Sequence, residues 1–105
     1  MAEMSDSKSV ETLVTHAYLQ LVQVAWDEHR SRSASLGRFG NYEVRLIELL
    51  PGANVGCPAL WIELHDASNQ ISMDSIGCIN LEAAVLAAAQ AFSEAEELAN
   101  HKGGQ

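Results

Sequence analysis

Two carboxylates and one imidazole are the strongest candidates for chemistry in this sequence. Glu63 and His65 lie two residues apart in one segment, and Asp74 lies in the next. Such a set can hold a divalent metal, or act as an acid–base pair in which one carboxylate raises the pKa of the other. No ligand-spacing motif such as H-E-x-x-H accompanies them. The simpler interpretation is that they form the solvated side of a half-buried sheet.

The two cysteines, Cys57 and Cys78, are a weaker candidate. They could meet at one end of a hairpin as a metal pair or redox couple, but the tight C-x-x-C spacing is absent. Cys78 also precedes a predicted helix, whose N-terminus would lower the pKa of the thiol. Two small buried apolar residues are the simpler interpretation, and we expect no metal or other cofactor.

Two further features carry less information. His16 and His29 lie on a predicted helix, and the sequence nominates no Ser or Cys nucleophile for either. The stretch from Gly37 to Gly40 lacks the residues that follow the glycines of phosphate-binding loops. We interpret these features as a solvated helix end and a flexible connection, and predict no catalytic activity.

Net charge restricts the partners. The 105 residues include 14 acidic and 6 basic ones, a formal charge of −8. Phosphate backbones and anionic membranes require clustered Lys and Arg, so direct binding to nucleic acid or to a membrane is not expected. An acidic surface would suit a basic protein, and its predicted members are Glu94, Glu96, Glu97, Glu63 and Asp74. No secretory signal or membrane-spanning run is visible, which predicts a cytoplasmic protein with reduced thiols.

The first half of the chain is expected to form one helix and one strand. Apolar residues at steps of three and four predict a helix from Ser7 or Ser9 to about Arg32. Residues 33–40 are predicted to be a link without regular structure. Residues 42–46 alternate as a strand with Tyr42, Val44 and Leu46 inward, and the alternation breaks at 47–50, which predicts a bulge or a strand end there.

The second half is expected to form a hairpin and a long helix. Strands 59–66 and 71–79 flank a loop at 67–70, a register that places Leu64 opposite Met73, Glu63 opposite Asp74 and Trp61 opposite Ile76. Glu63, His65 and Asp74 would then share the face without helices. A continuous apolar stripe predicts the final helix over 80–100, capped by Asn80.

This element order, α-β-β-β-α, predicts a two-layer α+β fold, a three-stranded antiparallel meander with both helices on one face. We expect a single domain over residues 1–105, with 1–8 and 101–105 flexible. Trp61, Ile76 and Ile47 would lie on the open side of the sheet as an apolar interface. Alternatively, the link 33–40 covers them, with Phe39 as a plug.

The sequence therefore favours a small acidic protein-interaction module that forms a homodimer. One alternative is an inhibitor or immunity-type protein that binds a basic partner such as a nuclease. The other is a small metal-assisted or acid–base enzyme that uses Glu63, His65 and Asp74.

Overall fold

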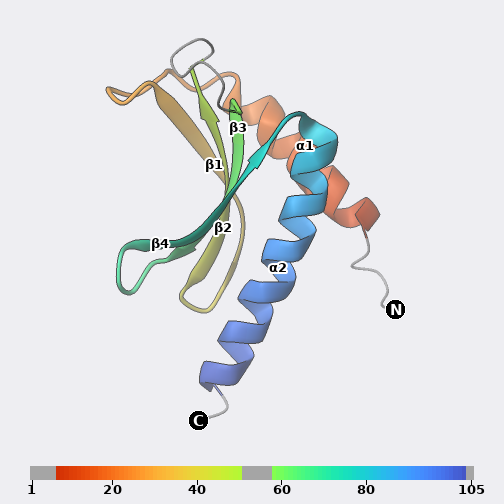
Figure 1. Ribbon diagram of the computed structural model, residues 1–105, viewed down its shortest axis with the longest axis vertical. Coiled ribbons are helices and arrows are strands. Elements are labelled where there is room, and N and C mark those ends of the chain that lie inside the picture. Colours follow the sequence, from red (N-terminus) through yellow and green to blue (C-terminus); the bar gives the residue numbers. More distant parts are fainter. Residues whose placement is uncertain (1–6, 51–57, 104–105) are drawn as a thin grey trace.

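The computed structural model describes the backbone of residues 7–50 and 58–103 and the side chains of residues 9–50 and 58–100. A four-stranded antiparallel sheet is covered on one face by two helices (Figure 1). The elements in chain order are α1 (Ser7–Leu21), β1 (Ser31–Phe39), β2 (Tyr42–Leu49), β3 (Leu60–Asp66), β4 (Ile71–Cys78) and α2 (Leu81–Gly103). The predicted two-layer α+β architecture is confirmed, but the sheet has four strands in the order β1-β2-β3-β4, not three.

Helix α1 is much shorter than predicted. It ends at Leu21, because the buried stripe of Val10, Val14, Ala17 and Leu21 already spans the part of the sheet that it covers. The next apolar residues, Val22 and Val24, are β-branched and 41% and 47% exposed. Val22 and Val24, whose apolar side chains predicted a longer helix, are therefore not part of the core.

The segment predicted as a link is strand β1. Its serines at 31, 33 and 35 alternate with Arg32, Ala34 and Leu36, which face the helices. A two-residue turn joins β1 to β2, and Gly40 has a φ of 61°, in the left-handed region that glycine tolerates. Phe39 points to the helix layer, where its ring centroid lies 5.8 Å from that of Phe92. The alternative in which Phe39 plugs the open side is therefore wrong.

Strand β2 ends at Leu49, within the predicted range 47–50, but it stays in phase up to that residue, so the predicted loss of alternation is wrong. Leu46 and Glu48 are both buried on the helix side, with Ile47 on the other side. A buried carboxylate interrupts the apolar alternation, and Arg32 stabilises it: its Nε and Nη2 atoms each lie 2.8 Å from Glu48 Oε1.

The register of β3 and β4 differs from the predicted one. His65 pairs with Ser72 as expected, but a shift follows between Leu64 and His65, so that Leu64 pairs with Asp74. Ile62 then pairs with Ile76, and Trp61 with Gly77. This bulge inserts Met73 and moves Asp74 and Ile76 to the helix side. Their predicted position on the open side was wrong.

Alanines allow helix α2 to pack closely on the sheet. Asn80 is the predicted cap: its Oδ1 atom accepts a hydrogen bond from Ala83 N at 2.8 Å. The helix continues to Gly103, beyond the predicted end at Asn100. Its small side chains at the sheet contact let the backbone approach, and the buried ones are Ala84, Ala87, Ala88, Ala91 and Ala95.

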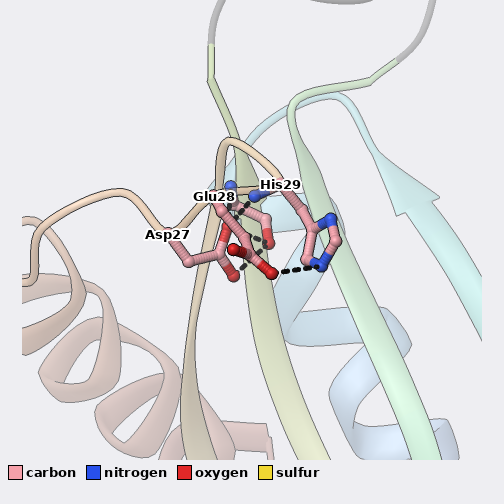
Figure 2. A network of polar contacts seen from close by, with 4 residues as sticks. Asp27, Glu28 and His29 are labelled. Carbon is pink, nitrogen blue, oxygen red and sulfur yellow. Dashed lines mark hydrogen bonds and ion pairs between the residues drawn. The ribbon is translucent and has the colours of Figure 1, made fainter.

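The connection from α1 to β1 is fixed by polar contacts. The Asp27 carboxylate accepts hydrogen bonds from His29 N at 2.8 Å and from Ser31 N at 2.9 Å. His29 Nε2 lies 3.5 Å from Glu28 Oε2, and both side chains are exposed (Figure 2). The predicted solvated position of His29 is confirmed, in a turn and not at a helix end. The turn sets the start of β1.

Candidate interaction surface on the open sheet face

The face of the sheet opposite the helices is the surface on which the sequence placed an interface. We call it the open face; no described element lies over it, and both helices are on the other side (Figure 1). Its residues follow from the strand registers: Ser31, Ser33, Ser35 and Arg38 from β1, Glu43, Arg45, Ile47 and Leu49 from β2, Trp61, Glu63 and His65 from β3, and Ser72, Ser75 and Gly77 from β4. The two central strands thus carry the large side chains, and the edges are mostly small.

Trp61 is the largest side chain of the open face. Its indole Nε1 donates a hydrogen bond to the carbonyl oxygen of Pro58 at 2.9 Å. The ring lies against Gly77 on the neighbouring strand, where an added Cβ would come within 3.3 Å of Trp61 Cη2 and 2.8 Å of Pro58 Cγ. Glycine at 77 therefore leaves room for Pro58 and for the indole to approach β4 closely.

A shallow apolar hollow lies next to this indole. It has a volume of about 290 Å³ and is lined by Ile47, Leu49, Trp61, Glu63 and Ser75. Ile47 and Trp61 pair across β2 and β3, as the predicted interface requires. Ile76, the third predicted member, packs against the core on the helix side and is not part of this surface.

A compact ion-pair cluster occupies the middle of the open face. Arg45 Nε donates to Glu43 Oε1 at 2.9 Å, and Arg45 Nη1 lies 3.6 Å from Glu63 Oε1. Burial raises the pKa of Glu43, but the hydrogen bonds from Arg45 and Ser35 outweigh it and lower the pKa below its usual value. Glu63 Oε1 is buried without a hydrogen bond, so its charge is balanced by Arg45 alone within the described residues.

The proposed catalytic or metal set is not assembled. Glu63 and His65 lie on the open face, but Asp74 is on the opposite side, where it lines a gap with Ile62, Ala91 and Glu94. Within the described residues, no three His, Cys, Asp or Glu side chains are grouped as a metal site requires. The β4 bulge therefore removes the geometric basis for the acid–base hypothesis.

The predicted acidic surface is divided between the two faces. Asp74 and Glu94 are on the helix side, and Glu96 and Glu97 are exposed on the same helix, α2. Glu63 is on the open face and is paired with Arg45. Of the predicted members, Asp74 of β4 and the three glutamates of α2 are exposed, whereas Glu63 is half-buried.

Cys78 is a core residue. Its side chain is 2% exposed, and its Sγ donates to the carbonyl oxygen of Ile76 at 3.4 Å. Burial raises the pKa of the thiol, the opposite of the lowering expected from the nearby helix N-terminus. Cys57 lies outside the described residues, so the proposed pairing of the cysteines stays a prediction.

Both edges of the sheet are irregular. On β1 the register shifts between Ser35 and Gly37, and on β4 the bulge inserts Met73. Bulges and inward-facing charges such as Asp74 hinder the addition of another strand. The open face is therefore a more regular surface than either edge of the sheet.

Sequence reasoning missed the contribution of β1 to this surface. The alternating serines at 31, 33 and 35 were a usable period-two signal, but this segment lacks the β-branched and aromatic residues that mark strands.

Within the described residues, neither helix has the length and apolar composition needed to cross a membrane. No family model matches the sequence, and comparison with curated proteins and with solved structures gave no match either.

Proposed function

We propose that this domain is a protein-interaction module that forms a homodimer through its open face. The observation that carries the proposal is the combination of an apolar patch and zero net charge on that face. Ile47, Leu49 and Trp61 form the apolar patch, and small residues at the edges leave it accessible to a flat partner.

The charge distribution supports a second copy of the chain as the partner. The open face holds two arginines, Arg38 and Arg45, and two glutamates, Glu43 and Glu63. The formal charge of −8 therefore arises from the rest of the chain. Two copies repel each other less when their open faces approach than when their helix layers do.

The size of the face sets the expected affinity. Four strands about 4.8 Å apart and about seven residues long present roughly 450 Å². This is about half of the ~800 Å² that each partner buries in a standard interface. We therefore expect a dissociation constant in the micromolar range.

Sedimentation equilibrium tests the proposal. Over about 1–200 µM protein the mass should rise from 11.4 kDa toward twice that value. Ile47→Glu places an unpaired charge in the apolar patch and should keep the chain monomeric. Ile71→Glu is the matched control, because Ile71 is 53% exposed on edge strand β4 and outside the open face.

Two outcomes would contradict the proposal. One is a monomer over the whole concentration range. The other is association that survives Ile47→Glu but is lost in Ile71→Glu, which would assign it to the β4 edge.

Salt provides an independent check. Screening weakens the repulsion between two chains of charge −8, so dimerisation should strengthen as ionic strength rises. Association that weakens with salt would indicate that opposite charges, and not the apolar patch, hold the copies together.

A further inference from the structure

A second hollow lies between the two helices, on the opposite side of the molecule from the open face. It is lined by Glu11 and Thr15 of α1 and by Leu81, Glu82, Val85 and Leu86 of α2, with a volume of about 390 Å³. We call it the interhelical groove. It lies where the N-terminal part of α2 passes α1 (Figure 1).

The groove has an apolar floor between two acidic walls. Leu81, Val85 and Leu86 supply the floor, and Leu86 is 67% exposed although it is a large apolar side chain. Each helix contributes one carboxylate, Glu11 from α1 and Glu82 from α2. An apolar surface between acidic groups matches a partner that carries apolar and basic side chains together.

The surroundings of the groove have the same sign of charge. The described side chains of the helices, residues 9–21 and 81–100, include five glutamates and no Lys or Arg. A second copy of this chain would bring the same charges and be repelled, and so would an anionic lipid surface. Charge complementarity therefore selects a basic occupant.

We propose that the interhelical groove docks a basic amphipathic helix of a partner protein. A third helix fits between two packed helices by placing its ridge of side chains into their groove. Its apolar stripe would cover Leu86 and Val85, and Lys or Arg beside the stripe would pair with Glu11 and Glu82. This site is separate from the open face and does not depend on dimerisation.

A synthetic peptide of about 18 residues, with Leu at helical spacing and Lys elsewhere, is a suitable probe. Its affinity is measured by titration calorimetry, and its position by shifts in the amide NMR spectrum of the ¹⁵N-labelled chain. A peptide of the same composition, scrambled to remove the stripe, is the control. The striped peptide should bind about tenfold more tightly, with the largest shifts around Thr15 and Leu86.

Matched variants locate the contact. Leu86→Ser removes the exposed part of the floor, and Glu11→Gln/Glu82→Gln removes the acidic walls. Each should weaken binding about tenfold, whereas Glu96→Gln/Glu97→Gln, with the same change of charge but in the C-terminal half of α2, should leave it within about twofold. Ile47→Glu, in the open face, should bind like the wild type.

Three results would overturn the proposal: equal binding of the scrambled peptide, shifts centred on the open face, or equal loss of binding in the groove and control variants. A dimer that forms normally in Leu86→Ser would keep these failures distinct from failure of the dimer proposal.

Discussion

Substitution of Arg32, on the helix side of the sheet, is predicted to destabilise the fold strongly. Its guanidinium lies 2.8 Å from Glu48 Oε1, donates to the carbonyl oxygens of Val22 and Val24 at 3.3 and 2.9 Å, and stacks 3.9 Å from the ring centroid of Trp26. One side chain therefore joins strand β2 to the segment that follows α1.

The magnitude follows from the burial of the pair. The side chains of Arg32 and Glu48 are only 13% and 10% exposed. Arg32→Met would leave the Glu48 carboxylate without its cation, and breaking a buried pair in this way costs about 3–5 kcal/mol. That is a large part of the ~5–15 kcal/mol that stabilises a small domain.

Urea unfolding followed by far-UV circular dichroism, at protein concentrations below the expected dimer range, measures this loss. Glu28→Gln is the control: Glu28 also forms an ion pair, with His29, but the two side chains are 86% and 79% exposed, so little change in the free energy of unfolding is expected. The double variant Arg32→Met/Glu48→Leu removes both charges and should be more stable than Arg32→Met alone. A loss below about 1 kcal/mol for Arg32→Met, or a double variant less stable than the single one, would refute this reasoning.

Two more predictions concern the sheet and its hairpin. Gly77→Ala should lower the free energy of unfolding in urea by about 1–3 kcal/mol, because the new Cβ would lie 2.8 Å from Pro58 Cγ and 3.3 Å from Trp61 Cη2 and would displace the indole. Ser75→Ala on the same strand should change this free energy little. Equal losses in the two variants would contradict the close contact at Gly77. Hydrogen bonds from the side chains of Asn69 and Ser68 lower the pKa of Asp66. The ionised carboxylate therefore stabilises the folded state above about pH 4, and this stabilisation is lost as the pH falls through the lowered pKa. Asp66→Asn should therefore lower the melting temperature at pH 7 and have a much smaller effect near about pH 2, whereas a pH-independent difference would argue against the ionised carboxylate.

The elements that the sequence predicted well each carry one clear period. Helix α2 has an uninterrupted apolar stripe and a capping asparagine, and the loop at 67–70 separates two apolar segments. Strand β1 was missed because serine, which fills one of its faces, is typical of loops as well as of solvated strand positions. The length of α1 was overestimated because apolar side chains continue past Leu21 without being buried.

The open face was predicted only in part, for two reasons. Glu48 occupies a buried position of β2 where the alternation calls for an apolar residue, and its carboxylate is stable there because Arg32 pairs with it. This long-range pair concealed the true extent of β2. The bulge at Met73 reversed the facing of Ile76 and Asp74, and bulges have no reliable signal in a single sequence. Trp61 and Ile47 lie before these irregularities along their strands and were placed correctly.

The helix layer also has a consequence for the order of folding. It joins the first and the last elements of the described chain, and α1 and α2 pack against each other and against the same sheet. During synthesis the four strands emerge before α2, so the side of the sheet that holds Val44, Leu46 and Ile62 stays without this cover until then. Contacts between segments so distant in sequence form slowly, and exposed sheet surface is prone to aggregation. The irregular strand edges would then protect the nascent chain at the stage when its core is still open.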